Sequence, residues 1–237
     1  MCGRYVSASP PDELARYFGA QVGGEQLEES YNVAPTDSVY AVRARDGHRE
    51  LETVRWGLVP FWAKDPKIGS RMINARAESV ADKPAFRRAY QKRRCLLPAD
   101  GFFEWEKIAG QKRKQPWFIH RVDAEPLVFA GLWEFWVAKD DDGADVGDPV
   151  VSCTIITTAA NETMAPIHDR MPVLVPPSAW DRWLDPETAG SEVADLLVPA
   201  PEGLLERHTI TTAVNSVRND GPELIVEAPP LADAESA

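Results

Sequence analysis

Four consecutive strand-like runs in the middle of the chain constrain its fold more than any other feature. They are rich in β-branched and aromatic residues and are separated by short polar turns. They cover residues 95–107, 115–122, 127–137 and 149–160. Strand patterns also precede them in YNVAPTDSVYAVR and ELETVRWGLVP, and ERHTITTAVN predicts a last strand. Because strands dominate and helical patterns are short, the sequence predicts one β-rich α+β domain.

The expected helices are few. Residues 11–19 begin with proline and end with glycine, which marks both boundaries of a short helix. The stretch 75–93 predicts two short helices interrupted at Pro84. PSAWDRWL and SEVADLLV predict two further amphipathic helices.

Two polar segments are expected to lie outside the packed core. Residues 139–148 read as a mobile acidic hairpin loop. We expect the domain to span residues 2–225, because the acidic tail 226–237 lacks apolar periodicity and is expected to be disordered.

The remaining bulk features indicate a soluble cytoplasmic protein. The chain has no apolar run of about 18 residues that could span a membrane. Its first residues lack the basic and apolar regions of a secretory signal. Cys2, Cys95 and Cys153 are far apart and form no CxxC, which argues against a disulfide framework and against a metal site. Cys95 and Cys153 lie in apolar strand patterns and are expected in the core.

Charge is unevenly distributed along the chain. The net charge is −11, which on average argues against nucleic acid. However, residues 64–94 contain ten Lys and Arg against three acids, whereas residues 181–237 contain twelve acids against three arginines. The basic segment, which includes Arg71, can hold phosphates while the acidic end keeps the protein soluble. A solvated helix face explains part of the same cluster.

Cys2 follows the initiator methionine directly. Removal of Met1 is usual before a small residue, and it would leave Cys2 with a free α-amine beside its own thiol. An amine with a pKa of about 7.7 to 8.0 is partly unprotonated at neutral pH. It can condense with an aldehyde to an imine, and the thiol can then close a thiazolidine ring. The alternative is an ordinary residue at a frayed terminus. Gly3 permits a close backbone approach, and Arg4 is a candidate anion contact.

Two further candidates are Asn74 in MINARAES and Glu104 in DGFFEWEK. Asn74 can cap the helix expected after it, or it can hold a sugar hydroxyl or an amine without competing for protons. Strand alternation places Glu104 opposite Phe103 and Trp105. A carboxylate crowded by aromatic rings is suited to proton transfer, whereas Glu106 fits an exposed strand acid better.

His168 and Arg170 lie two residues apart in APIHDRMPVLV, at a loop-to-strand junction where functional side chains tend to gather. His168 is structural or is the acid–base partner of Cys2.

Two loop segments carry ring side chains that could contact nucleic acid. Trp56 and Trp62 lie in WGLVPFW, and Pro35 lies in NVAPT. Exposed tryptophan or proline can stack on or wedge between unstacked bases. We expect Trp56 in the core and Trp62 on the surface.

Together, MCGRY, the NVAPT turn, WGLVPFW, the NARAE segment, GFFEW and IHDRMPV closely resemble the SRAP family (SOS-response-associated peptidase), the abasic-site-processing proteins. The resemblance runs from residue 2 to about residue 218. It implies a single α+β domain with a curved, barrel-like antiparallel sheet, short peripheral helices and a positively charged groove for single-stranded DNA. The acidic segment 139–148 and the acidic C-terminal region are not motifs of the family.

The resemblance also implies roles for individual residues. Cys2 would bond covalently to the aldehyde of an abasic deoxyribose, Asn74 would position the sugar, Glu104 would assist proton transfer and His168 would stabilise the opened sugar. Contacts to DNA are expected from Arg4, Pro35, Trp62, Arg71, Arg76 and Arg170. No cofactor or metal is implied, and replication proteins are conceivable partners that the sequence does not identify.

Two other functions remain open from the residues. Cys2 could attack an amide carbonyl, with its own amine or His168 as base, as in a cysteine hydrolase. Alternatively, the basic segment and Trp62 could form a noncovalent module for single-stranded DNA.

Overall fold

The computed structural model describes residues 2–140 and 142–231. Its centre is a five-stranded barrel in which each strand pairs with two other strands of the barrel. Neighbouring strands are antiparallel except where β11 meets β5 in parallel and closes the ring. In order around the barrel, the strands are β4 (Ser38–Arg45), β5 (His48–Trp56), β11 (Asp145–Ala159), β10 (Leu127–Lys139) and β7 (Arg94–Ala99).

Three short strands extend the barrel at its margins. β2 (Ala20–Val22) pairs in parallel with β5, and β6 (Asn74–Arg76) pairs in parallel with β11 just beyond the end of β5. β12 (Arg170–Pro172) pairs antiparallel with the end of β11. The expected barrel-like sheet is confirmed, with three parallel strand pairs among the antiparallel ones.

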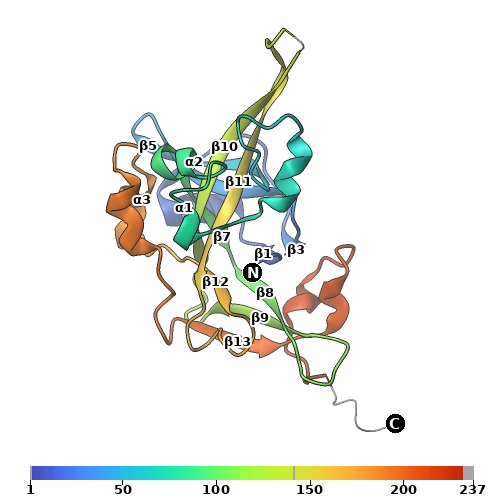
Figure 1. Cartoon of the computed structure of the whole chain (residues 1–237). Helices are drawn as coiled ribbons and strands as arrows, with labels where there is room; N and C mark the ends of the chain where they lie inside the picture. The colour runs from blue at the N-terminus through green and yellow to red at the C-terminus, as the bar shows by residue number, and fades with distance from the viewer. Residues whose placement is uncertain (1, 141, 232–237) are drawn as a thin grey trace.

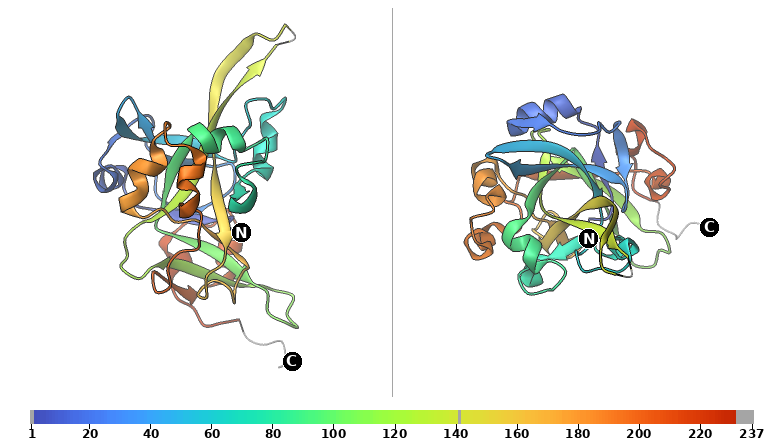
Figure 2. Two further views of the ribbon diagram at one scale, coloured as in Figure 1. Left: turned by 60° about the vertical axis from the view of Figure 1, so that its left-hand side comes forward. Right: turned by 90° about the horizontal axis from the view of Figure 1, so that it is seen from above.

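A second sheet lies at the end of the barrel opposite to the projecting hairpin of β10 and β11 (Figures 1 and 2). Its strand order is β13, β9, β8, β1, β3, and each neighbouring pair is antiparallel. The bounds are β1 (Tyr5–Ser7), β3 (Ser30–Val33), β8 (Gly101–Glu106), β9 (Gln115–Arg121) and β13 (Leu205–Thr209).

The helices are short and lie around the barrel (Figure 2). α1 (Pro11–Phe18) ends at Gly19, whose φ of 59° is the left-handed conformation that glycine adopts without strain. α2 (Arg87–Lys92) and α3 (Trp180–Leu184) complete the α-helices of the described residues. The 3-10 turns are Pro66–Arg71, Ala77–Ser79, Pro177–Ala179, Gly190–Leu196, Thr212–Asn215 and Pro222–Ile225. None of the described helices is long and apolar enough to cross a membrane.

Alternation along the barrel strands sends side chains to two separate cores. One set fills the barrel interior, and the intervening set packs against the helices outside. The interior cluster includes Val39, Ala41, Val54, Trp56, Cys95, Leu97, Phe129, Cys153 and Ile155. The outer cluster includes Tyr40, Val42, Leu51, Leu96, Val128, Ala130, Leu132 and Ile156. Cys95, Cys153 and Trp56 are fully buried, as the sequence predicted.

Several local expectations differ from the structure. The stretch 75–93 begins as strand β6, and only one 3-10 turn precedes α2. SEVADLLV forms a 3-10 rather than an α-helix. Part of 139–148 continues the strand ladder, since Lys139 pairs with Asp145 and Ala138 with Val146, while residue 141 lies outside the described residues. The strands project well beyond the barrel (Figure 1).

The start of the tail is also ordered by contacts. Ala228 N–H donates to Thr209 O at 2.8 Å, and Leu231 N–H donates to Gln115 Oε1 at 2.6 Å. The expectation of disorder from residue 226 therefore does not hold for residues 226–231. Residues 232–237 lie outside the described part of the chain.

Candidate reactive site at Cys2

Cys2 lies three residues before β1, the first strand of the second sheet, and is fully buried in the interior cluster of the barrel. Burial raises the pKa of its thiol well above the usual value, and the Glu104 carboxylate raises it further, whereas the Arg4 backbone N–H acts in the opposite direction. The thiol is therefore protonated at neutral pH. A reaction that consumes the sulfur needs a base to remove this proton.

Asn74 touches Cys2 directly. Its Nδ2 donates a hydrogen bond of 2.7 Å to the Cys2 carbonyl oxygen. β6 holds Asn74 in place, because Asn74 lies opposite Ile155 of β11. The following 3-10 turn has no side-chain cap, so the capping interpretation is not supported. The Oδ1 atom is buried and has no hydrogen-bond partner among the described residues, which leaves an acceptor beside Cys2.

Glu104 lies in the middle of β8 and is only 3% exposed. Phe103 packs in a separate cluster with Trp105 against it, on the opposite face of the sheet, as strand alternation predicted. β8 pairs with β1, and the Phe103 N–H donates to Arg4 O at 3.0 Å, so Glu104 lies beside the chain end that carries Cys2. A buried carboxylate next to a protonated thiol can accept its proton.

His168 lies at a loop-to-strand junction, two residues before β12. Its backbone N–H donates to Met164 O at 3.0 Å, closing a turn. The Nδ1 atom accepts from the Arg170 N–H at 3.0 Å and lies 2.7 Å from Asp169 Oδ1. Both contacts use Nδ1, so the Nε2 atom is the one suited to act on a substrate. These partners belong to the loop itself rather than to Cys2.

Arg170 is held by the protein. Its guanidinium makes a bidentate pair with Glu78, at 2.7 and 3.0 Å, and also donates to Thr157 O at 2.5 Å. The hydrogen bond from Arg170 is the largest cause of the lowered pKa of Glu78. Arg170 thus ties β12 to the turn after β6, the strand that carries Asn74. Arg76, at the end of β6, is exposed.

Arg4 is likewise engaged within the fold. Its NH1 atom donates to Asn32 Oδ1 at 2.7 Å and to Val214 O at 3.1 Å. Its guanidinium carbon lies 5.9 Å from the centre of the Trp105 ring. Arg4 therefore links β3, the segment at 214 and β8 around Cys2, which is a structural role that the sequence did not indicate.

A loop between β5 and β6 carries the exposed aromatic and basic groups. It leaves the barrel at Gly57, whose φ is 125°, and packs backbone to backbone against Gly69; a Cβ on Gly57 would lie 2.7 Å from Gly69 O. Trp62 is 48% exposed, as expected for a surface ring. It lines a cleft of about 440 Å³ together with Arg71.

The structure places Pro35 at the turn between β3 and β4, where it is half-buried. The Thr36 N–H beside it donates to Trp56 O at 2.8 Å, which connects this turn to the end of β5. The loop with Trp62 and Arg71 starts at that same strand end. The segments that carry Pro35 and Trp62 thus both lie next to the end of β5.

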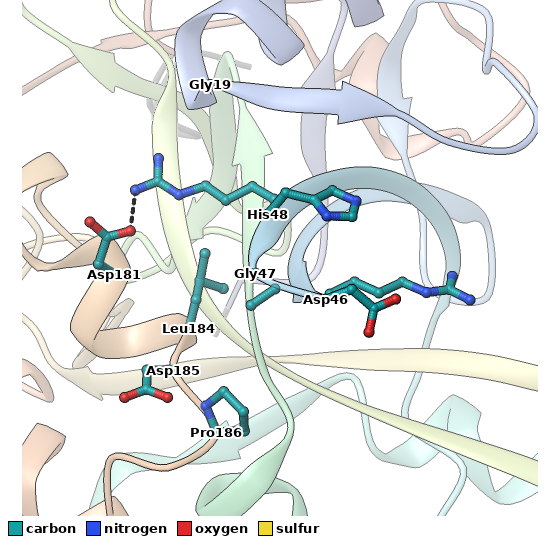
Figure 3. A pocket seen from close by; sticks show the side chains of 11 residues that line it. Gly19, Asp46, Gly47, His48, Asp181, Leu184, Asp185 and Pro186 are labelled. Carbon is teal, nitrogen blue, oxygen red and sulfur yellow. Dashed lines mark hydrogen bonds and ion pairs between the residues drawn. The ribbon is translucent and has the colours of Figure 1, made fainter.

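A larger cleft, of about 710 Å³, lies elsewhere (Figure 3). It is bounded by the turn at Gly47 and by α3, and Arg49 crosses it to pair with Asp181 at 2.6 Å. None of the candidate residues lines it. Among the residues that the structure describes, no group of three His, Cys, Asp or Glu side chains is placed to hold a metal.

The geometry brings the buried Cys2 and Glu104 and the half-buried Asn74 into one site, and β6, β11 and β12 connect Arg76, Arg170 and His168 to it. The sequence did not single out the Tyr5 hydroxyl, which is buried without a hydrogen-bond partner among the described residues. Burial raises its pKa well above the usual value, with the Cys153 and Cys2 thiols as further causes. Only the alternation of β1 could have indicated that Tyr5 points inward.

The chain matches the family model described as "SOS response associated peptidase (SRAP)" over residues 1–217. It is 39% identical over 228 residues to the abasic site processing protein YoqW of Bacillus subtilis, covering 95% of this chain and 99% of that protein. It is 32% identical to the abasic site processing protein YedK of Escherichia coli, covering 95% and 99%. The abasic site processing protein HMCES of Gallus gallus is 34% identical, covering 95% and 77%.

Solved structures show the same fold. A protein from Bacteroides thetaiotaomicron superposes with a TM-score of 0.85 at 26% identity, covering 96% of this chain and 100% of that one. A protein from Bordetella bronchiseptica superposes with a TM-score of 0.72 at 26% identity, covering 89% and 100%.

Proposed function

The chain belongs to the SRAP family, and on that premise we propose that it processes abasic sites in DNA by capturing them covalently through Cys2. The observation that carries this proposal is the contact of Cys2 with Asn74, at 2.7 Å, beside the buried Glu104. Three relatives that match along nearly the whole chain are named abasic site processing proteins.

The first step is the exposure of an amine. In the full chain the Cys2 nitrogen is part of a peptide bond, and removal of Met1 converts it into a primary amine. An abasic site is an aldehyde masked as a cyclic hemiacetal. Opening of the sugar ring moves a proton from O1′ to O4′, which is work for His168 Nε2 and Glu104.

The amine and the thiol then both bond to C1′. The Cys2 nitrogen attacks the aldehyde carbon, and one water molecule leaves as the imine forms. The sulfur adds to the imine carbon, and the thiol proton passes to the nitrogen through Glu104, which gives a thiazolidine without any oxidant. Because the thiol is protonated in its buried surroundings, the proton-accepting carboxylate is essential to ring closure.

Asn74 orients the reacting groups. Its Nδ2 fixes the backbone of Cys2, and its Oδ1 can accept a hydrogen bond from a sugar hydroxyl. Two neutral polar atoms do this without exchanging protons with the substrate, so Asn74 acts by position rather than by acid–base chemistry.

Contacts to single-stranded DNA come from the rim. Trp62 offers a stacking surface for an unpaired base, and Pro35 a wedge, while Arg71 and Arg76 are exposed and can pair with phosphates. Arg4 and Arg170 are already bound to Asn32 and Glu78, and these pairs stabilise the walls of the site. They can contact phosphates only if DNA displaces these partners.

The test is incubation of the purified protein with a single-stranded oligonucleotide that contains one abasic site, followed by a denaturing gel. We expect a heat-stable shifted band that Cys2→Ala abolishes. Retained binding on a native gel without a covalent band would instead support a noncovalent module. Turnover of an amide substrate without DNA capture would support a cysteine hydrolase.

A further inference from the structure

The loop between β8 and β9 is the most basic part of the chain outside the segment 64–94. Its residues 107–114 contain four Lys and Arg and no acid, although the net charge of the whole chain is −11. Lys112, Arg113 and Lys114 are consecutive and exposed, and Lys107 at the other end of the loop is exposed too. Unlike the basic segment at 64–94, this loop contains no helix that would explain its charges as a solvated face.

The loop lies directly beyond the reactive site. Glu104 pairs with Trp117, and Glu106 pairs with Gln115 at the end of the same ladder. Lys107 therefore lies about 10 Å from Glu104 along the strand, at about 3.4 Å per residue, and the rest of the loop extends further.

Trp117 and Arg207 stack on each other on the face of the sheet that carries Glu104. Trp117 lies opposite Glu104 on β9 and is half-buried. The guanidinium carbon of Arg207, on β13, lies 4.7 Å from the centre of the Trp117 ring. Trp117 Nε1 donates to Glu106 Oε2 at 2.9 Å, which fixes the ring. The sheet thus adds one more basic side chain, Arg207, beside the ring that lies opposite Glu104.

The loop cations are available to a ligand. In the described part of the chain, no carboxylate forms an ion pair with Lys112, Arg113 or Lys114. By contrast, Arg121, at the far end of β9, pairs with Asp123 at 2.5 Å. Unpaired cations that cluster on an acidic protein attract a polyanion, because counterion release favours its binding.

We propose that the β8–β9 loop, with Lys112, Arg113 and Lys114 at its centre and Arg207 beside it, binds the DNA backbone on one side of the captured nucleotide. The inference rests on the proposed function for the identity of the polyanion. It assigns to this loop phosphates a few nucleotides from the reacting sugar, a region that Trp62 and Arg71, on the β5–β6 loop, do not share.

The acidic end of the chain is the competing occupant. Leu231 donates to Gln115 Oε1, at the base of the loop, and Asp233 and Glu235 follow it in the sequence. If the loop served mainly to hold this segment, substitution of its cations would leave DNA binding unchanged and would lower thermal stability.

The experiment measures equilibrium binding of the full-length protein to an undamaged single-stranded oligonucleotide between 0.05 and 1 M salt. The variant is Lys112→Gln, Arg113→Gln, Lys114→Gln. Loss of three phosphate contacts should reduce the slope of log K against log salt by about 2. The affinity should fall by up to about 100-fold at 0.1 M salt, and the difference should vanish near 1 M. An undamaged strand makes this result independent of covalent capture.

A matched control removes three exposed cations elsewhere: Arg16→Gln on α1, Arg45→Gln on β4 and Lys139→Gln at the hairpin. It has the same net charge as the loop variant, and its slope of log K against log salt should be nearly that of the wild type. Equal slopes for the wild type and the loop variant would overturn the proposal. An equal loss in both triple variants would also overturn it, because overall charge would then explain binding.

A second readout locates the contact. Oligonucleotides with one abasic site are shortened stepwise on either side, and the concentration that gives half-maximal crosslinking is measured. For the wild type it should rise when one side becomes too short to reach the loop, while the same shortening of the other side has less effect, and the loop variant should lose this asymmetry. Symmetric dependence in the wild type would contradict the assigned position. Absence of any crosslink would reject the proposed function but leave the salt result standing.

Discussion

Cys2 and Cys153 lie in the same hydrophobic cluster, yet their surroundings prepare them for different chemistry. Both side chains are fully buried, and burial raises the pKa of both thiols. The further cause at Cys153 is another buried thiol, Cys95, whereas at Cys2 it is the Glu104 carboxylate. Cys2 also receives a hydrogen bond from Asn74. Burial alone is expected to leave a thiol inert, so under the proposed mechanism the neighbouring carboxylate is what distinguishes Cys2 from Cys153.

The largest expected effect comes from removing each thiol in turn. Cys2→Ala should lower stable covalent capture of an abasic oligonucleotide by at least about 1,000-fold, since it removes the sulfur that closes the ring and leaves only an amine, whose imine with the sugar is hydrolysed. Cys153→Ala should leave the capture rate within about twofold, although it lowers stability by about 1 to 3 kcal/mol through the cavity it creates. Quenched time courses on denaturing gels give the capture rates of both variants. A comparable loss of capture in Cys153→Ala would erase the distinction.

The second-largest effect is expected from replacing Glu104, the proposed proton acceptor. Glu104→Gln should slow capture about 100-fold or more, because the amide cannot accept the thiol proton. Glu106→Gln is the matched control on the same strand, since a glutamine oxygen can still accept from Trp117 Nε1. Capture rates and DNA affinity are measured together. If Glu104→Gln lost DNA affinity instead of rate, Glu104 would be a structural residue.

These two predictions show what the sequence could and could not provide. The ends of α1, the burial of Trp56, the exposure of Trp62 and the inward face of Glu104 follow from local patterns, which depend on neighbouring residues only. The parallel closure of β11 on β5 could not be predicted, because it joins strands about 100 residues apart.

The same limit applies within the site. Arg4 and Arg170 read as phosphate contacts from their motifs, but their partners, Asn32 and Glu78, come from distant segments. Asn74 read equally well as a helix cap, because nothing local shows that β6 lies beside Cys2. Side-chain roles that depend on tertiary partners become visible only in the fold.

A smaller effect should appear in the pH dependence of stability. Burial raises the pKa of the Cys95 thiol to about 12, and that of Cys153 is raised as well. Unfolded thiols ionise near pH 8.5. Above this pH the unfolded state binds fewer protons than the folded state, so the free energy of unfolding falls as pH rises, by about 1.4 kcal/mol per pH unit for each thiol.

Urea unfolding of Cys153→Ala between pH 8.5 and 10 tests this sign. Its stability should decline less steeply than that of the wild type, by about 1.4 kcal/mol per pH unit. Below pH 8 the two proteins should show parallel pH dependence. An unchanged slope above pH 8.5 would mean that Cys153 is not protected from ionisation in the folded state.

The smallest effect separates an exposed arginine from an engaged one. Arg76→Gln should reduce the salt slope of single-stranded DNA binding by about 0.7, or about fivefold in affinity at 0.1 M salt. Arg170→Gln should chiefly lower the melting temperature, because it breaks the pair with Glu78 and the bond to Thr157. Salt titrations and thermal melts of both variants are compared. An unaltered slope in Arg76→Gln would exclude Arg76 from the DNA contacts.

The central claim is that one cysteine supplies both bonding atoms to the damaged sugar. Mass spectrometry of the proteolysed adduct tests it most directly. We predict that the mature chain begins at Cys2 and that the sugar is attached there with the loss of one water, in a product that borohydride does not need to trap. An adduct on a lysine, or on a chain that still carries Met1, would contradict the mechanism.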